Sequence, residues 1–167
     1  MGRVRAMREG TLTRSAEDRR RFELEGYGWL RSEGWLTHKA GAGATSGAGW
    51  RFEPQGWTGG RAEALDATSG LPVGVYRRTG SFRQRGTVTW GARSYELTGV
   101  GWAGERFQLS SDGATLVELK VRGWGKKRVA LTIDESLDRE PGLVLFTCWL
   151  VQLLVEQSSA AATSAAT

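Results

Sequence analysis

The sequence is poor in the residues that support covalent or metal-based chemistry. Its 167 residues include one cysteine, Cys148, and one histidine, His38. A single cysteine excludes an internal disulfide framework and fits a reducing compartment. A lone His without Cys partners excludes a typical zinc site, and a catalytic triad would need His38 beside a G-x-S-x-G elbow that the chain lacks. No P-loop or dinucleotide-binding fingerprint occurs. We therefore expect a protein that is not an enzyme and uses no cofactor and no metal.

Proline is scarce and apolar leader segments are missing, whereas glycine and tryptophan are abundant. The chain has 3 Pro, 24 Gly and 8 Trp. Such a turn-rich, aromatic-rich composition is typical of many short strands in a single domain. The first twenty residues contain no apolar stretch, so no secretory signal is visible. We expect a cytoplasmic protein that can also be peripheral to a membrane.

Alternation of apolar and polar residues predicts a long series of short strands. Turn signals rich in Gly and Asp separate them, and a spacing of about ten residues between strand centres is typical of sandwiches and barrels. In residues 71–76 the apolar side of the alternation is Leu71, Val73 and Val75. Residues 40–49 consist only of Gly, Ala, Ser and Thr, a composition that predicts a mobile loop. The expected strands are 22–25, 28–32, 34–39, 50–53, 61–66, 71–76, 87–90, 94–97, 106–109, 117–121 and 129–133.

Residues 142–155, GLVLFTCWLVQLLV, predict one helix of a different character. Pro141 suits the first helical turn, and acidic residues precede it, where the helix dipole favours them. The helix has no polar face, so it must be buried on all sides, in a protein core or in a membrane. Fourteen residues span about 21 Å, which is short against a hydrocarbon core of about 30 Å. We therefore expect a core helix in preference to a membrane anchor.

One architecture buries both the apolar face of the sheet and the whole helix. The sheet closes into a barrel, and the helix fills it. A helix about 10 Å across needs more than the eight strands whose own side chains fill a small barrel. We predict a mainly β protein: an antiparallel, closed barrel of about twelve strands around one hydrophobic C-terminal α-helix. The predicted domains are a basic flexible arm at 1–21, the barrel at 22–157 with its central helix at 141–156, and a disordered tail at 158–167.

Positive charge is concentrated in two parts of the chain. Residues 1–21 hold seven Arg and three acidic residues, and residues 77–128 hold eleven basic and four acidic residues. The first group, Arg3, Arg5, Arg8, Arg14 and Arg19 to Arg21, could touch an anionic surface or form a solvated leader. Residues 22–167 together carry only +1, which does not favour nucleic acid, so most Trp residues are expected in the core.

Two basic clusters within residues 77–128 are candidate sites for anionic phospholipid. Arginine binds phosphate in a bidentate manner, and Gly-rich turns let a headgroup approach the backbone. The alternative is a set of solvated loops whose charges protect strand edges. Asp134, Glu135 and Asp138 do not have EF-hand spacing, so they indicate a helix start and not a calcium site. The candidate lipid-binding residues are Arg77, Arg78, Arg83 and Arg85 around one hairpin, and Lys126, Lys127 and Arg128 after Gly125.

The order of these features resembles the tubby C-terminal-like superfamily, which includes the LURP-one-related proteins and the phospholipid scramblases. The resemblance covers roughly residues 22–157 and rests on the segments SYEL (94–97), TLVELKV (115–121), the turn at Trp124 and the closing EPGLVLFTCWLVQLLV. It implies a twelve-stranded barrel threaded by a C-terminal hydrophobic helix. Tubby proteins bind phosphoinositides through basic residues on the barrel, but none of those residues can be matched individually here. The Cys-rich, palmitoylated region of scramblases has no counterpart.

Three functions are compatible with these patterns. The first is a non-enzymatic barrel that binds anionic phospholipid or a membrane surface through a basic face. The second is a structural or protein-interaction module without lipid binding. The third is an enzyme or carrier with a ligand inside the barrel, which the central helix should prevent. Binding that depends on salt and on anionic lipid distinguishes the first from the second.

Overall fold

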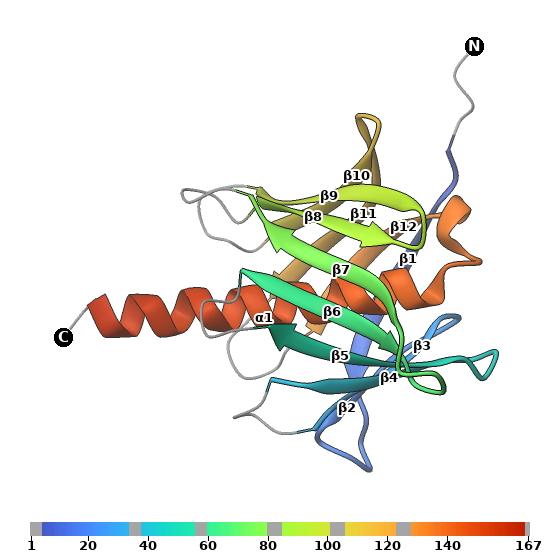
Figure 1. The fold of residues 1–167 in the computed structure, drawn as a ribbon, viewed down its shortest axis with the longest axis horizontal. Coiled ribbons are helices and arrows are strands. Elements are labelled where there is room, and N and C mark those ends of the chain that lie inside the picture. Colours follow the sequence, from blue (N-terminus) through green and yellow to red (C-terminus); the bar gives the residue numbers. More distant parts are fainter. Residues whose placement is uncertain are drawn as a thin grey trace.

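The computed structural model describes residues 5–33, 38–55, 60–79, 85–100, 106–122 and 128–165. In this part of the chain, twelve strands form one closed antiparallel barrel, and a short 3₁₀ helix and one α-helix follow them (Figure 1). The fold class predicted from the sequence is therefore confirmed. The elements are β1 (Met7–Arg14), β2 (Arg21–Leu24), β3 (Gly28–Ser32), β4 (Ala40–Ala44), β5 (Gly49–Gln55), β6 (Arg61–Asp66), β7 (Pro72–Arg78), β8 (Arg85–Trp90), β9 (Arg93–Val100), β10 (Arg106–Ser111), β11 (Ala114–Arg122), β12 (Arg128–Asp134), η1 (Glu135–Leu137) and α1 (Pro141–Ala165).

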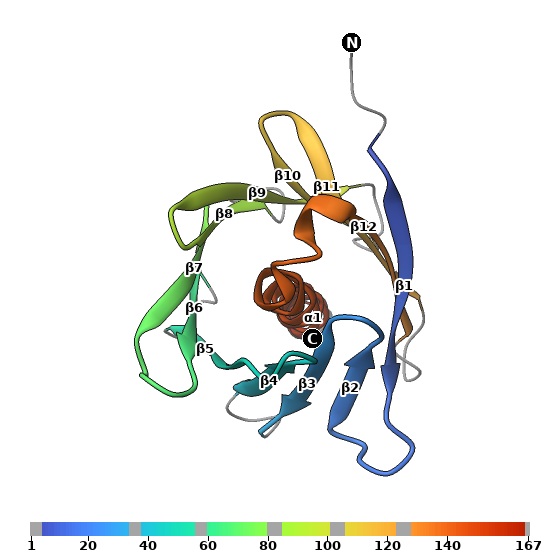
Figure 2. The ribbon, with the colours of Figure 1, turned by 90° about the vertical axis from the view of Figure 1, so that its right-hand side faces the viewer.

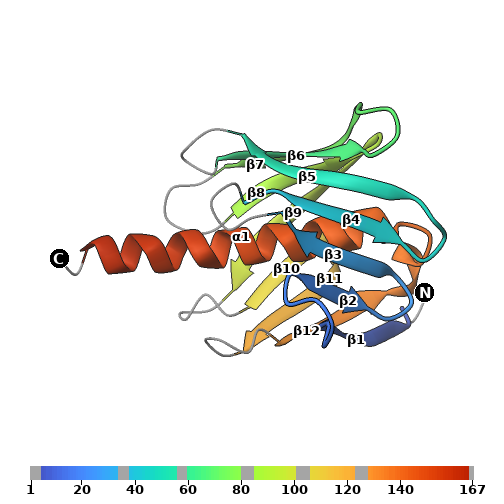
Figure 3. The same cartoon turned by 90° about the horizontal axis from the view of Figure 1, so that it is seen from below.

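The barrel has the simplest possible connectivity. Each strand pairs with the next one along the chain, and β1 closes the ring by pairing with β12 over the register Met7↔Asp134 to Leu12↔Val129. Because the strands alternate in direction, the connections after β1, β3, β5, β7, β9 and β11 all lie at one end of the barrel. We call this the exit end, because α1 leaves the barrel there; the opposite end, where α1 begins, is the entry end (Figures 1 and 3).

The helix α1 runs through the bore of the barrel (Figure 2). From Leu143 to Leu154 its side chains are buried, apart from the partly exposed Gln152. Leu145 is 0% exposed and Trp149 is 5% exposed, so protein and not lipid surrounds this apolar rod. The buried hydroxyl of Thr147 donates to the carbonyl of Leu143 at 2.8 Å, which satisfies the polar group inside the helix itself. The predicted core helix is confirmed, and it continues to Ala165, through most of the tail predicted as disordered.

Side-chain size explains why α1 lies to one side of the bore. The helix packs closest to β3, β4 and β5, and Figure 2 shows it near this wall. The inward residues of β4 are alanines, Ala40, Ala42 and Ala44, so the helix can approach the strand closely. On the opposite wall, larger buried residues such as Phe107 and Leu131 fill the wider gap. Small and large residues thus face one another across the helix, as close packing requires.

Aromatic rings connect α1 to the wall near the entry end. Phe146 lies 5.1 Å from Phe52, 5.8 Å from Trp90 and 5.8 Å from Trp149, measured between ring centroids. Trp50 contacts Trp90 edge-on at 6.1 Å. The Phe146–Trp149 pair is stacked, with an interplanar angle of 16°, and the other pairs are tilted or edge-on. They fix both the rotation and the depth of the helix in the barrel.

Three local predictions are wrong. Residues 7–14 of the predicted flexible arm form β1, a full wall strand; its inward side offers only Leu12 as a buried apolar residue, so the period-two signal is absent. Residues 40–44 of the predicted loop form β4. In the predicted strand 34–39, His38 and Lys39 are not in a strand, and residues 34–37 lie outside the described residues. Gly43 leaves room for the indole of Trp29, because a Cβ there would lie 2.5 Å from Trp29 Nε1.

The predicted face of β7 is also reversed. Leu71 is 65% exposed and Val73 and Val75 are only partly buried, whereas Tyr76 is 1% exposed. The ring of Tyr76 packs against Gly86 inside the barrel, at a place where any Cβ would collide with it. In β7 the ring of Tyr76, packed against Gly86, therefore fills the core in place of the predicted Leu71, Val73 and Val75.

Candidate functional site: the basic end of the barrel

Basic side chains gather at the exit end. They come from the ends of successive strands and from their connections, so that sequence-distant residues form one ring. Some of these bases have acidic partners, such as Arg31 with Asp18 at 2.9 Å and Arg61 with Glu63 at 3.3 Å. Others, such as Arg77 and Arg106, form no ion pair with the residues that the structure describes. The described bases at this end are Arg14, Arg19, Arg20, Arg21, Arg31, Lys39, Arg61, Arg77, Arg78, Arg85, Arg106 and Lys120.

The entry end carries the opposite charge. Its described bases are few, and two of them, Arg93 and Arg139, are exposed. The charge of the protein is thus divided along the barrel axis, with an acidic entry end and a basic exit end. The helix dipole has the complementary direction, since its positive N-terminus lies at the acidic end and its negative C-terminus at the basic end. The acidic residues at the entry end are Glu9, Glu25, Asp66, Asp112, Asp134, Glu135, Asp138 and Glu140.

The structure describes part of the predicted lipid-binding clusters, and that part lies at the exit end. Arg77, Arg78 and Arg85 flank the β7–β8 connection, and the backbone of Arg128 begins β12 at the same end. In the order of the strands, the β9–β10 connection, which is followed by Arg106, lies between the β7–β8 and β11–β12 connections at this end. The guanidinium Nε of Arg85 is 3.0 Å from Glu96 Oε1. The predicted residues Arg83, Lys126 and Lys127 lie outside the described residues, as does the side chain of Arg128.

A pocket opens at the exit end between α1 and the β1–β4 side of the rim. We call it the rim pocket; its volume is about 260 Å³. The arginines that line it are exposed, whereas its apolar lining residues are buried and form its floor. The guanidinium of Arg14 lies over the ring of Phe22, 5.5 Å from its centroid, at the boundary between the two zones. The lining residues are Arg14, Arg19, Arg20, Phe22, Leu30, Ser32, His38, Lys39, Ala40, Trp149, Gln152, Leu153 and Glu156.

The helix contributes an unsatisfied polar group to this pocket. The side-chain amide nitrogen of Gln152 is buried and has no hydrogen-bond partner among the residues that the structure describes. A buried donor without a partner costs about 1–3 kcal/mol, so natural proteins seldom retain one without a reason. The sequence showed Gln152 only as an interruption of the apolar helix, and nothing in the spacing placed it beside Arg14 or Arg20.

His38 ties the rim to the helix. Its carbonyl oxygen accepts a hydrogen bond from Trp149 Nε1 at 3.2 Å, and its ring Nδ1 lies 3.5 Å from Glu156 Oε2. Its φ of 53° is left-handed, which is uncommon for a residue other than glycine and marks a tight connection into β4. Among the described residues, no group of three His, Cys, Asp or Glu side chains could hold a metal ion. His38 therefore connects the rim to α1 in two ways, through its backbone carbonyl and through its ring.

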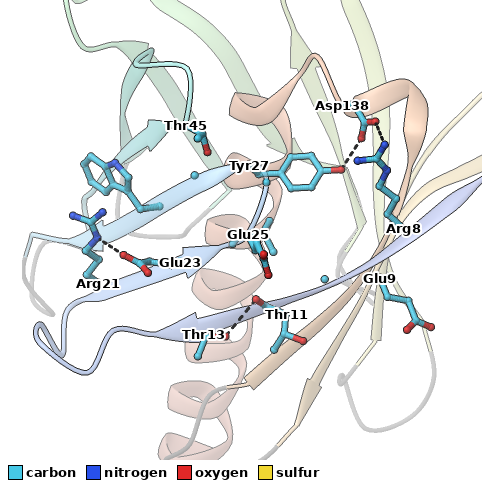
Figure 4. A pocket seen from close by; sticks show the side chains of 15 residues that line it. Arg8, Glu9, Thr11, Thr13, Arg21, Glu23, Glu25, Tyr27, Thr45 and Asp138 are labelled. Carbon is cyan, nitrogen blue, oxygen red and sulfur yellow. Dashed lines mark hydrogen bonds and ion pairs between the residues drawn. The ribbon is translucent and has the colours of Figure 1, made fainter.

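A second, larger recess of about 1140 Å³ lies at the wall beside the short strand β2 (Figure 4). Tyr27 closes the inner side of this seam: its hydroxyl donates to Asp138 Oδ1 at 3.0 Å, and Arg8 pairs with Asp138 Oδ2 at 3.1 Å. Burial, and then the hydrogen bond to Asp138, raise the pKa of Tyr27 to about 12. Arg21 is paired with Glu23 at 3.2 Å. The bonds among Tyr27, Asp138 and Arg8 thus form a latch beside the β1–β2 seam.

The cysteine is not among the residues that line either cavity. Cys148 is 1% exposed in the middle of α1, and burial raises the pKa of its thiol to about 12. A thiol that is neutral at physiological pH and shielded from solvent is a poor nucleophile. It acts as a small packing residue in the core.

Two further findings concern the whole chain. Within the described ranges, no helix is both long enough and apolar enough to cross a membrane. In comparisons with family models, curated proteins and solved structures, none matches this chain, so the resemblance to the tubby-like superfamily remains a prediction.

Proposed function

We propose that this protein is a non-enzymatic, cytoplasmic barrel that binds anionic phospholipid at a membrane surface through its exit end. The observation that carries the proposal is the division of charge along the barrel axis. A uniformly charged or randomly patterned surface would give a membrane no preferred side, whereas in the described part of this barrel bases outnumber acids at the exit end and acids outnumber bases at the entry end. The resemblance to the tubby-like superfamily supports the same function.

The expected affinity follows from the number of bases that reach the surface. Each Lys or Arg near an anionic membrane contributes about 1 kcal/mol, and the attraction decays within a Debye length of about 10 Å at 0.1 M salt. Arg77 and Arg106 are well suited to this role, because they are exposed and form no ion pair among the described residues. Binding through them should weaken steeply as salt rises.

The test is flotation of the protein with vesicles of phosphatidylcholine alone or with phosphatidylserine. The exit-end variant Arg77→Glu/Arg106→Glu is compared with the entry-end control Arg93→Glu/Arg139→Glu, which changes the net charge by the same amount. Losing two bases should cost about 2 kcal/mol, and the two new carboxylates are repelled as well, so affinity should fall at least about thirtyfold in the exit-end variant only. Equal loss in both variants, or equal binding to neutral and anionic vesicles, would overturn the proposal. Absence of any vesicle binding would favour a protein-interaction module.

A further inference from the structure

The rim pocket has features that a purely electrostatic contact with a membrane does not need. A flat ring of bases is enough for attraction to anionic lipid. Here, in addition, a cavity of about 260 Å³ combines basic side chains, an apolar floor and an unsatisfied amide. We propose that the rim pocket binds one phosphate-monoester headgroup of a phospholipid, with the first methylenes of its apolar part on the floor. This inference rests on the proposed function and names the lipid class that the exit end would select.

The bases on the polar side of the pocket are available to a ligand. The β1–β2 connection holds two acids. Asp18 is already engaged, since its carboxylate accepts from Arg31 Nε at 2.9 Å and from the backbone N–H of Arg20 at 2.9 Å. Glu17 is exposed and is not among the residues that line the pocket. Arg14 and Arg19 form no ion pair with the described residues. Two guanidinium groups beside an apolar surface match a phosphate dianion, because each can donate a pair of hydrogen bonds to its oxygens.

The helix side of the pocket fits the remaining parts of such a ligand. The amide nitrogen of Gln152 is closed to solvent, so this side chain would have to rotate toward the pocket; it could then donate to a phosphate or ester oxygen and no longer be unpaired. Below it, Phe22, Trp149 and Leu153 form an apolar surface that inorganic phosphate could not use. The combination of both zones points to an amphiphile and not to a free ion.

The volume and the acidic residue of the pocket limit what can enter. Ligand pockets for drug-sized molecules usually measure about 300–1,000 Å³, so the rim pocket is too small for a complete diacyl lipid. It suits a phosphate, its glycerol oxygen and a few methylenes, with the acyl chains left in the bilayer below the exit end. Glu156 is the only acid among the described residues that line it, and its carboxylate lies 3.5 Å from His38. A larger, more highly phosphorylated headgroup would meet this carboxylate.

The experiment uses a soluble probe, dihexanoyl phosphatidic acid below its micelle concentration, titrated into the full chain. Dihexanoyl phosphatidylcholine and inorganic phosphate serve as comparison probes. Binding is followed by the ¹⁵N–¹H shifts of the Trp149 indole and the Gln152 side-chain amide. We expect phosphatidic acid to shift both signals, with a dissociation constant at least tenfold lower than that of either comparison probe. Equal binding of inorganic phosphate would show that the apolar floor has no role and would overturn the inference.

Three variants separate ligand binding from structural effects. Arg14→Gln/Arg19→Gln should weaken phosphatidic acid binding at least tenfold, whereas the entry-end control Arg93→Gln/Arg139→Gln, which removes the same charge outside the pocket, should leave it unchanged. Gln152→Leu should raise the thermal midpoint, because an unpaired buried donor is removed, and should weaken binding of the probe. A Gln152→Leu protein that binds the probe as tightly as the parent contradicts the inference.

The outcomes also distinguish this inference from the proposed function. A protein that binds anionic vesicles in a salt-dependent way but shows no probe-induced shift of Trp149 or Gln152 retains the proposed function and loses the pocket. A protein that binds the soluble probe in the pocket but does not bind vesicles retains the pocket and loses the proposed function.

Discussion

Replacing Gly142 by alanine tests whether the helix is wedged between ring systems at the entry end. Alanine is the better helix former by about 1 kcal/mol in a helix interior, so helix propensity alone predicts a gain in stability. The structure predicts the opposite. A Cβ at position 142 would lie 2.5 Å from Trp90 Cζ2 and 2.7 Å from Trp50 Cζ2, where ordinary carbon contacts are about 3.5–4.0 Å. The two indoles would have to move by about 1 Å.

Neither indole is free to move without loss. Trp90 packs on Phe146 and edge-on against Trp50, so a shift of one ring disturbs the others. Overpacking of this kind costs about 1–3 kcal/mol, and the propensity gain is reduced because Gly142 is in the first helical turn. We expect Gly142→Ala to lower the free energy of unfolding by about 1–2 kcal/mol.

Urea denaturation followed by tryptophan fluorescence provides the measurement, with the midpoint and slope fitted separately. The control is Gly41→Ala, where the nearest atoms to the new Cβ would be 3.8 Å away and no ring has to move. This control should be neutral or stabilised by up to about 1 kcal/mol, because alanine restricts the unfolded chain. A Gly142→Ala protein as stable as the parent, or more stable, would refute the wedged arrangement.

Three other predictions concern the core and the latch. Phe146→Ala should lower the free energy of unfolding by about 3–5 kcal/mol, since a fully buried ring with three aromatic neighbours is lost, and a change below about 1 kcal/mol in urea denaturation would contradict the packing. Tyr27→Phe should cost about 1 kcal/mol at neutral pH through the lost hydrogen bond to Asp138. Because the folded pKa of Tyr27 is about 12, above the ordinary 10.0, its contribution is complete below pH 10 and is lost as pH rises toward 12, so stability curves of parent and variant should converge over that range. Cys148 should resist an aromatic disulfide reagent in the folded protein and react within minutes in denaturant, and fast reaction of the folded protein would exclude a buried thiol.

Strands of the barrel were predictable where one face is regularly apolar. They were not predictable where backbone pairing or small residues complete the wall instead. The helix and strands such as β10 and β12 have strong periodicity, because aliphatic and aromatic residues meet α1 directly. β1 was missed because closure of the ring depends on backbone pairing with β12, which leaves no apolar pattern in the sequence. β4 was missed because its small residues serve two partners, α1 inside and Trp29 outside.

The candidate site was predictable only in part, for a similar reason. Arg77, Arg78 and Arg85 stand out as a local cluster, and the meander topology then places them at one end with Arg106. The rim pocket combines residues 14–20 with residues 149–156, which are separated by most of the chain. Charge clusters can be seen in a sequence, but a cavity between a rim and a helix exists only after the ring has closed.

The orientation of the barrel on a bilayer tests the central claim most directly. A fluorophore is attached to Thr79→Cys at the exit end, or to Thr68→Cys at the entry end, since the buried Cys148 should not react. The labelled proteins are then mixed with anionic vesicles that contain nitroxide-bearing lipid. The account predicts strong quenching of the label at position 79 and little at position 68. Equal quenching at the two positions, or stronger quenching at position 68, would contradict it.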